Sequence, residues 1–260
     1  QLDQREPFGS RRIVSNHPVV PNFCLNAFVP CSNGLHPQAR FCAMSPVDWD
    51  THWSKFGLSS RLNPAQAFRR RLVRKLLAST PPSTILDIGC GPGDLLSELS
   101  EQFPNAQLTG VDVSASGLEQ AQARLPEASF LHADLTLGPA EKVQTEPASH
   151  AICTEVLEHV DEPATLLRNA APLIAADGTL VVTVPGGPMS AFDKHLGHRR
   201  HFTKAALKDV LEDAGFELKK ISAAGFPTFN LYRLTVLLRG EKLINDTEGS
   251  PPLLARLGFI

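Results

Sequence analysis

TILDIGCGPGD, residues 84–94, carries the strongest structural signal in this chain. Its first five residues are mainly apolar or β-branched, which predicts a short buried strand. Glycine then recurs at every second position, as a backbone requires where it turns with positive φ or approaches a ligand closely. Leu95, Leu96 and Leu99 follow at helical spacing, so the loop would present its ligand to a helix N-terminus.

The glycine spacing narrows the class of ligand. The pattern is G-x-G-x-G, and Asp94 stands where dinucleotide-binding proteins carry the third glycine of G-x-G-x-x-G. An acid there would repel a pyrophosphate, and no Gly-Lys-Ser/Thr follows as it would in a P-loop. The loop therefore favours a ligand without phosphates, and the preceding Asp87 favours one that carries positive charge.

Strands and helices alternate on both sides of this loop. Asn63 and Pro64 are typical of an N-cap and a first helical residue, Thr203 is typical of the N-cap of a later helix, and Asp177 with Gly178 is typical of a turn. Further strands are expected at residues 108–113, 130–131, 150–154, 179–184 and 216–221, with helices between them. This order predicts an α/β fold with a doubly wound, mostly parallel sheet and helices on both faces. Such sheets bind ligands at the carboxyl ends of their strands.

Three acidic residues fall at the ends of three consecutive predicted strands. Asp87 precedes the glycine loop, Asp112 ends the second strand, and Asp134 follows the third. In nucleotide-binding folds, an acid at the end of the second strand takes the ribose hydroxyls. We expect the three carboxylates to lie at one edge of the sheet, beside the glycines.

The motifs LDIGCGPGD, GVDVS, HADL and TEVLEHV resemble, in order and spacing, those of class I S-adenosylmethionine-dependent methyltransferases of the type 11 and 23 kind. The resemblance covers about residues 60–222 and implies a Rossmann-like fold with S-adenosylmethionine as cofactor. It assigns the methionine part of the cofactor to Asp87, Gly89 and Gly91, the ribose to Asp112, the adenine to Val113, Asp134 and Leu135, and the methionine end to Glu155.

The segment EVLEH, residues 155–159, follows the strand at 150–154 and would bring two carboxylates and an imidazole together on a helical turn. Two chemistries use such a set. His159, with Glu158 beside it, could act as a general base that removes a hydroxyl proton. Alternatively Glu155, Glu158 and His159 could bind a divalent metal such as Mg²⁺, which lowers the pKa of a hydroxyl.

This cluster resembles that of the ubiquinone-biosynthesis O-methyltransferases and of the small-RNA 2′-O-methyltransferases, which are similar in using E-x-x-E-H with a metal. The small-RNA family adds a histidine later in the chain. Here the candidates lie in KHLGHRRHF, residues 194–202. His198 is the first choice as a further metal ligand, before His201 and His195.

The E-x-x-E-H cluster favours oxygen as the methylated atom, and we expect a small, largely apolar acceptor. No Asn/Asp-Pro-Pro-Tyr/Phe motif of amino-directed nucleic-acid methyltransferases is present. A net charge of −2 weighs against nucleic acid as a partner. The basic run at residues 69–75 is interpreted as a solvated helix face.

Two other classes of function stay open. A nicotinamide-dependent oxidoreductase would also use a glycine loop, although Asp94 and the absence of a Tyr-x-x-x-Lys pair count against it. A cofactor-binding but inactive partner subunit would keep the loop without turnover. No pattern in the chain indicates an oligomeric state.

The chain divides into a leader and a domain. Residues 1–43 are rich in proline and lack periodicity, so we expect a poorly ordered leader, either a targeting peptide or non-native sequence. Residues 44–260 would form the methyltransferase domain, with an apolar segment at 226–260 and its last strand missing. Trp49, Trp53 and Phe56 could form an apolar lid.

Composition indicates where the protein works. Five cysteines are too few for a disulfide framework, which favours a reducing compartment, and we expect a cytoplasmic protein. No apolar run reaches the length of a membrane span. The apolar segment 226–260 leaves peripheral membrane contact open, alongside a role as an active-site cap or a dimer face.

Overall fold

A computed structural model describes residues 11–16, 47–139, 146–225 and 234 of the chain. Within these ranges the side chains of residues 11–16, 56, 58 and 59 are not described. The expected apolar segment 226–260 therefore lies, apart from Leu234, outside the described residues, and so does the side chain of Phe56. No helix in the described ranges combines the length and hydropathy needed to cross a membrane.

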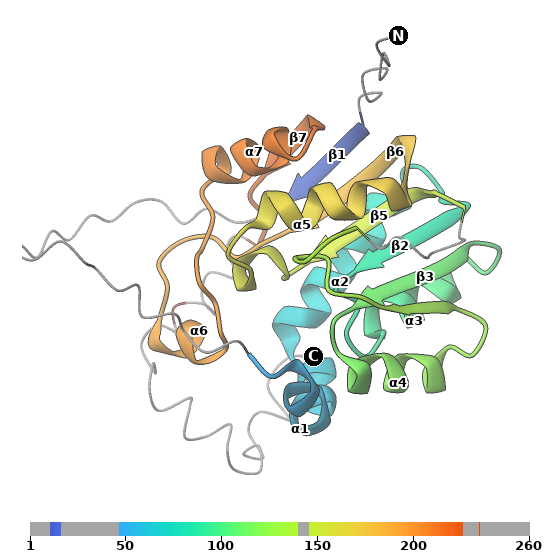
Figure 1. The fold of residues 1–260 in the computed structure, drawn as a ribbon, viewed down its shortest axis with the longest axis horizontal. Helices are drawn as coiled ribbons and strands as arrows, with labels where there is room; N and C mark the ends of the chain where they lie inside the picture. The colour runs from blue at the N-terminus through green and yellow to red at the C-terminus, as the bar shows by residue number, and fades with distance from the viewer. Residues whose placement is uncertain (1–10, 17–46, 140–145, 226–233, 235–260) are drawn as a thin grey trace, which may run out of the picture.

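One seven-stranded sheet forms the centre of the molecule, and all its neighbouring strands run parallel (Figure 1). The strand order is β4-β3-β2-β5-β6-β1-β7. The strands are β1 (Arg11–Asn16), β2 (Thr84–Ile88), β3 (Gln107–Asp112), β4 (Ser129–His132), β5 (Ala148–Thr154), β6 (Ile174–Thr183) and β7 (Phe216–Ser222). The order reverses between β2 and β5, and it is at such a switch point that doubly wound sheets bind ligands.

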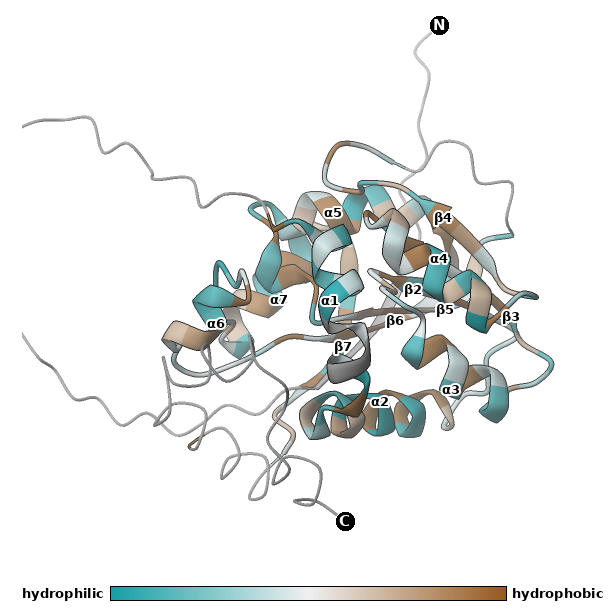
Figure 2. Ribbon diagram, turned by 90° about the horizontal axis from the view of Figure 1, so that it is seen from below, coloured by the Kyte–Doolittle hydropathy of each residue, from teal (hydrophilic) through white to brown (hydrophobic). Residues whose placement is uncertain are grey.

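Helices cover both faces of this sheet. Figure 2 shows α2 and α3 on one side of the strands and α5 and α7 on the other. The helices are α1 (Trp49–Leu62), α2 (Pro64–Leu77), α3 (Asp94–Gln102), α4 (Ala115–Arg124), α5 (Pro163–Ala170), α6 (Ala191–His195) and α7 (Lys204–Asp213), with 3₁₀ turns η1 (Leu157–His159) and η2 (Ala171–Leu173).

The sheet separates the buried apolar residues into two clusters. Leu167 and Leu211 belong to the cluster on the α5 and α7 face, together with Leu180 of β6. The next strand residue, Val181, belongs to the opposite cluster with Val73 of α2. Because successive residues of a strand point to opposite faces, a strand buried on both sides reads as a continuous apolar run.

Helix starts follow the local signals in the sequence. The Asn63 side chain accepts a hydrogen bond from the Ala65 N–H, and Pro64 is the first residue of α2. Thr203 caps α7 in the same way through the Ala206 N–H. Both predictions are confirmed, because a cap depends only on residues within one turn of it.

The expectation of a poorly ordered leader is wrong for residues 11–16. This segment forms β1, which pairs in parallel with β6 on one side and β7 on the other. Figure 1 shows β1, in blue, between β6 and β7. The sequence does not reveal this strand because its partners lie more than 150 residues away.

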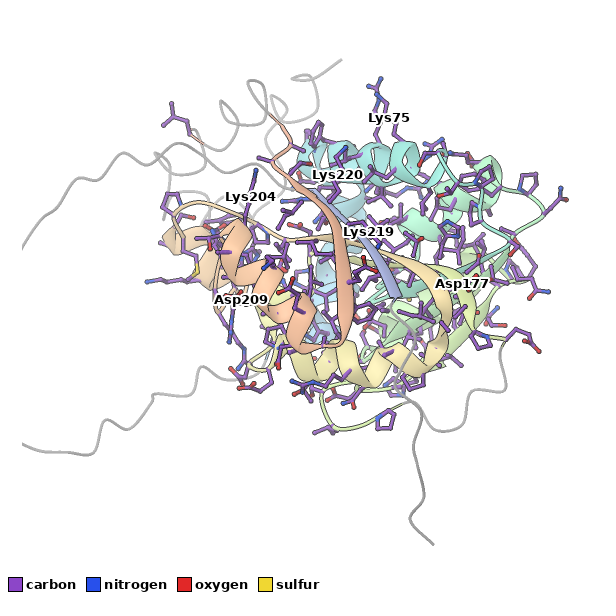
Figure 3. The ribbon with its side chains drawn as sticks, turned by 90° about the horizontal axis from the view of Figure 1, so that it is seen from above. Lys75, Asp177, Lys204, Asp209, Lys219 and Lys220 are labelled. Atoms are coloured by element: carbon purple, nitrogen blue, oxygen red, sulfur yellow. The ribbon has the colours of Figure 1, made fainter. Side chains whose placement is uncertain are left out.

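Asp177 and Gly178, where a turn was expected, lie within β6 at an irregularity, because the pairing of β6 with β5 passes from Ile174 directly to Thr179. Asp177 is labelled on this strand in Figure 3, in the same view as Lys219 and Lys220 of β7. A Cβ on Gly178 would lie 3.0 Å from the Ala148 carbonyl oxygen, and the pairing register shifts between Ala148 and His150. Gly178 is therefore required by the close approach of β5, at an irregularity in the ladder.

Candidate active site

The strand registers bring the predicted site to one edge of the sheet. Ile88 at the end of β2 pairs with Val111 of β3 and with Cys153 of β5, and Asp112 pairs with His132 of β4. The glycine loop, the residues after β3 and β4, and the segment 155–159 therefore leave the sheet at the same end. The expected juxtaposition of the acids and the glycines is confirmed as geometry.

The glycine loop has the backbone that its sequence predicts. Gly89, Gly91 and Gly93 have φ values of 74°, 50° and 74°, a region that favours glycine. A Cβ on Gly89 would lie 2.4 Å from Val156 Cγ2, and one on Gly91 would lie 2.7 Å from the Trp53 ring. A side chain at Gly89 would therefore clash with Val156, and a side chain at Gly91 would clash with Trp53.

Asp112 organises this loop. One carboxylate oxygen accepts a hydrogen bond from the Gly91 N–H at 2.7 Å, and the other accepts one from the Ser114 N–H at 2.8 Å. Burial raises the pKa of Asp112, and these backbone donors oppose the rise. The carboxylate is therefore held in a single orientation at the end of β3, as ribose recognition would need.

Asp87 lies beside Asp112 but lacks such support. Its side chain is only 2% exposed, and its Oδ1 has no hydrogen-bond partner among the described residues. Burial, together with the charge of Asp112, raises the pKa of Asp87 to about 7. A buried carboxylate in this condition provides a strong site for a positively charged group, which would supply the missing partner.

The residues expected at the adenine lie after β3 and β4. Val113 is 43% exposed, which is unusual for an apolar residue next to a sheet edge. Asp134 Oδ1 accepts hydrogen bonds from the backbone and side chain of Thr136. Leu135 is buried in the core, and its carbonyl oxygen already accepts a hydrogen bond from Asn169. Only the backbone N–H of Leu135 could therefore contribute to recognition in the expected way.

Glu155 follows β5 in the left-handed region, with φ 55°, where it is the only non-glycine among the described residues. Its carboxylate pairs with Arg69 at 2.8 Å and accepts a hydrogen bond from the Thr183 hydroxyl. Strained backbone of this kind concentrates at functional sites. The ion pair also leaves Glu155 outside the group of side chains in this structure that could share a metal.

Arg69 was missed by the sequence interpretation, which placed it on a solvated helix face. It lies four residues from Ala65 and four from Val73 on α2, within a buried stripe that continues to Leu77. Arg70 and Arg74 of the same run pair with Glu98 of α3. A basic residue inside an apolar i, i+4 stripe was the signal that could have identified Arg69 as part of the interior.

Glu158 and His159 lie on the 3₁₀ turn η1, as the expected helical turn requires. Glu158 is fully buried, neither carboxylate oxygen has a hydrogen-bond partner within the described ranges, and burial raises its pKa well above the usual value. Burial lowers the pKa of His159 to about 4. The site therefore contains a carboxyl group whose protonated form is favoured by burial, beside an imidazole that is unprotonated at neutral pH.

Aromatic rings surround His159. Trp49 of α1 and His198 each contact it edge-on, with ring centroids 4.8 Å apart in both cases. Trp53 stacks on Trp49 and contacts the glycine loop at Gly91. The N-terminal helix thus lies over both the loop and His159, where the sequence suggested an apolar lid.

Among the described residues, two groups of side chains offer ligand atoms within 4.8 Å of one another: Glu158 with His159 and His198, and Asp193 with His198 and His201. Three of the four expected metal ligands, Glu158, His159 and His198, are thus brought together, whereas Glu155 belongs to neither group. His195 is exposed at the end of α6 and belongs to neither group.

Comparison with known proteins identifies the family of this chain. The family described as a methyltransferase domain matches residues 64–221, more than half of the chain. This chain belongs to that family. The matched range begins at α2 and ends in β7, so it contains every acid and glycine of the proposed cofactor site.

Curated relatives carry a narrower name. The chain is 36% identical over 120 residues to a trans-aconitate 2-methyltransferase of Methylobacterium radiotolerans, covering 45% of each chain. It is 32% identical over 162 residues to one of Yersinia pestis, covering 61% of this chain and 60% of the relative. The chain thus spans about half the length of the curated relatives it matches.

Solved structures agree with the fold. The plantazolicin methyltransferase BamL, in complex with a triazolic desmethylPZN analog and SAH, aligns with a TM-score of 0.52 and 18% identity, covering 77% of this chain and 86% of that one. An O-methyltransferase family protein from Burkholderia thailandensis aligns with a TM-score of 0.53 and 17% identity, covering 64% and 55%. The chain therefore shares the methyltransferase family and the fold of these proteins, and the alternative of a nicotinamide oxidoreductase is not supported.

Proposed function

We propose that this enzyme transfers the methyl group of S-adenosylmethionine to a hydroxyl oxygen of a small, largely apolar acceptor, with His159 as the general base. The observation that carries the proposal is a partly buried imidazole, unprotonated at neutral pH, that contacts Trp49 and His198 at the edge of the sheet that carries the glycine loop. A hydroxyl must lose its proton as it is methylated, and an unprotonated imidazole can accept that proton. Its pKa of about 4 makes His159 a weaker base than an exposed imidazole, so the imidazolium needs stabilisation by a neighbouring charge.

The cofactor would lie across the acids and the glycine loop. Asp87, Gly89 and Gly91 would hold its methionine part, Asp112 its ribose hydroxyls, and Val113, Asp134 and the Leu135 N–H its adenine. The unpaired, buried carboxylate of Asp87 fits the positive charge of this cofactor. Glu155 would line the methionine end, held there by Arg69 and Thr183.

When bound, S-adenosylmethionine would supply a methyl group on a positively charged sulfur; the sulfur–methyl bond would break as the acceptor oxygen is methylated, leaving S-adenosylhomocysteine. The His159 imidazole would accept the hydroxyl proton, and the nearby charge of Glu155 favours the imidazolium that results. Glu158 lies beside His159, and burial raises its pKa. Trp49 and Trp53 would exclude water and offer apolar surface to the acceptor.

The charges around His159 favour a hydroxyl acceptor over a carboxylate such as trans-aconitate, the compound in the relatives' name. Arg69 pairs with Glu155, and Arg199 pairs with Asp161. A multiply charged acid would need cations that are not already neutralised. A carboxylate is also ionised at neutral pH, so its methylation would need no base.

The test replaces His159 and follows methyl transfer from radiolabelled S-adenosylmethionine to a panel of phenols, alcohols and carboxylic acids. We expect His159→Ala to lower turnover of hydroxyl acceptors by about 10²–10⁴-fold while the affinity for S-adenosylhomocysteine stays the same. The control is His195→Ala, since His195 is exposed on the adjacent helix α6. Unchanged turnover in His159→Ala, or methylation of the carboxylic acids alone, would contradict the proposal. A wild-type protein that binds cofactor yet methylates nothing would support the inactive partner subunit instead.

A specific observation favours a metal as an addition to this chemistry. Both carboxylate oxygens of Glu158 are buried without partners, close to nitrogen atoms of His159 and His198. One carboxylate and two imidazoles fit Zn²⁺, Mn²⁺ or Fe²⁺ better than Mg²⁺, which prefers oxygen ligands. When bound, the metal would act as a Lewis acid that lowers the pKa of the acceptor hydroxyl.

Metal binding is testable apart from turnover. Protein stripped with EDTA is titrated with Co²⁺, whose visible spectrum reports nitrogen and oxygen ligands directly. We expect one equivalent to bind and Glu158→Gln to weaken binding more than ten-fold. If Co²⁺ produces no ligand spectrum in the wild type, the base mechanism operates without a metal.

Location and partners complete the proposal. A small-molecule acceptor and a cytoplasmic enzyme are supported by the aromatic site and by the two described cysteines, Cys90 and Cys153, which are buried thiols rather than disulfides. Expected contact of segment 226–260 with a membrane surface falls outside the described residues.

A further inference from the structure

A chain of histidine contacts leads away from the site. His198, which contacts His159, lies with its Nδ1 3.1 Å from Nε2 of His201. His201 in turn places its own Nδ1 3.0 Å from the Gly187 carbonyl oxygen. Both rings are well covered, with the His201 side chain 4% exposed and His198 9% exposed.

The Gly187 carbonyl fixes the proton on Nδ1 of His201 and, while the His201 ring is neutral, the proton on His198 as well. A carbonyl oxygen can only accept, so Nδ1 of His201 must carry the hydrogen. In a neutral His201 the other nitrogen, Nε2, then has the lone pair and accepts from His198. His198 must therefore carry its proton on Nδ1, which leaves Nε2 of His198 unprotonated.

The Asp193 carboxylate oxygen nearest to His201 Nε2 is bonded to Ser190 instead of to His201. Asp193 Oδ2 lies 3.9 Å from His201 Nε2, too far for a hydrogen bond, and it accepts hydrogen bonds from the backbone and hydroxyl of Ser190. These bonds form a capping box at the start of α6. Burial lowers the pKa of His198, so the ring is neutral and a single tautomer can be selected.

We infer that His201 is a positioning residue that holds His198 in its Nδ1–H tautomer, so that the lone pair on Nε2 is the one available to the acceptor side of the site. The inference rests on the proposed function, because that function explains why a lone pair on Nε2 of His198 is needed. The lone pair could accept a proton in a relay or bind a metal ion. The sequence analysis did not assign this positioning role to His201. It considered His201 only as an alternative to His198 as a metal ligand.

The direct test is the tautomer itself. Two-bond ¹H–¹⁵N spectra of the EDTA-stripped protein, labelled on its histidine rings, distinguish Nδ1–H from Nε2–H. We expect Nδ1–H for both His198 and His201 in the wild type. An Nε2–H tautomer of His198, or two protonated nitrogens on His201, would overturn the inference whether or not the protein methylates anything.

Variants then separate positioning from simple support of the fold. His201→Gln keeps an oxygen that accepts from His198 and an amide that donates to Gly187, whereas His201→Phe keeps only the ring shape. We expect His201→Phe to lose the single tautomer of His198 and to lower kcat by at least ten-fold, and His201→Gln to restore both. The matched control is the exposed His195→Phe, which should change neither.

The possible failures are distinguishable. A wild-type Nδ1–H tautomer that His201→Phe leaves unchanged would show that His201 does not select it, and would overturn the inference while leaving the base role of His159 intact. Loss of the tautomer with no change in kcat would overturn the link to the proposed function. If His201→Phe does not fold, His201→Gln against the wild type still decides the tautomer question.

Discussion

At the scale of single residues, an ionised Asp87 carboxylate lowers the stability of the cofactor-free protein. Asp87 and Asp112 are both buried, but backbone N–H groups stabilise only Asp112. The pKa of Asp87 consequently reaches about 7, against 3.8 for the unperturbed group. The cofactor-free protein therefore favours binding of a positively charged group beside Asp87. Without that group, ionisation of the Asp87 carboxylate lowers the stability of the protein.

This imbalance predicts a pH dependence. Between pH 4 and 7 the folded protein holds a proton on Asp87 that the unfolded chain has released, so stability falls as pH rises through this window. We expect Asp87→Asn to remove that slope, which amounts to at most ~4 kcal/mol across the window. Urea unfolding of the cofactor-free protein at several pH values measures it.

The variant should also lower the affinity for S-adenosylmethionine, since it removes the buried negative charge. The control is Asp209→Asn, because Asp209 is exposed on α7 (Figure 3). An unchanged slope in Asp87→Asn would show that this carboxyl is not the group that titrates.

At the scale of elements, α1 is joined to α4 by several hydrogen bonds, and those of the Asp50 side chain lie at the start of α4. Asp50 accepts hydrogen bonds from the Ser116 N–H at 2.9 Å and from the Ser114 hydroxyl at 2.7 Å, at the N-terminus of α4. These bonds lower the pKa of Asp50. The attachment holds Trp49 and Trp53 over the glycine loop, so α1 is an element of the site although it precedes the family match.

Removing this attachment should loosen the helix without disturbing the sheet. We expect Asp50→Ala to increase acrylamide quenching of tryptophan fluorescence and amide exchange in α1, while exchange in β2 and β3 stays slow. Lys55→Ala, on an exposed position of the same helix, is the matched control. The same loosening should occur in the wild type as pH falls through the pKa of Asp50. Equal quenching in the wild type and Asp50→Ala would contradict the attachment.

The second element of interest is β1, which is hydrogen-bonded on both sides. Val14 pairs with Val181 of β6 and with Lys220 of β7. Val14→Pro would remove a backbone donor from the interior of the sheet and should cost about 3 kcal/mol or more of unfolding free energy. Chemical denaturation and amide exchange of β6 and β7 measure the effect.

Val14→Thr keeps the N–H and the β-branched shape, so it is the control for Val14→Pro. Stability equal to the wild type in both variants would mean that residues 11–16 do not contribute to the sheet. Loss in the proline variant alone would establish that a strand from the leader completes the fold.

At the scale of the whole molecule, cofactor binding and stability are linked. Because the proposed cofactor site joins β2, β3, β4 and the glycine loop, we expect a ligand that fills it to stabilise most of the sheet. At a concentration 100 times its Kd, S-adenosylhomocysteine should add about 2.7 kcal/mol and raise Tm by about 5–10 °C. Thermal unfolding with NADH as the control ligand checks the prediction. A shift with NADH, or none with S-adenosylhomocysteine, would contradict the assigned cofactor site.

Local pattern was sufficient for most of the fold. The strand 84–88, the glycine loop and the caps at Asn63 and Thr203 depend on neighbours within a few residues, and the structure has them where the sequence predicted them. The alternation of strands and helices likewise implied that the acids would meet at one edge, because parallel strands end on the same side of a sheet.

Local sequence pattern could not predict contacts between segments that are far apart in the chain. The pairing of β1 with β6 and β7, the ion pair of Arg69 with Glu155, and the proton positions on His198 and His201 all depend on groups brought together by folding. A sequence pattern registers the type and spacing of residues along the chain, whereas burial and hydrogen-bond direction arise only when the chain surrounds them. Residue types and their spacing were thus sufficient to predict the family and its cofactor. Only the folded structure shows that Glu155, expected as a metal ligand, forms an ion pair with Arg69.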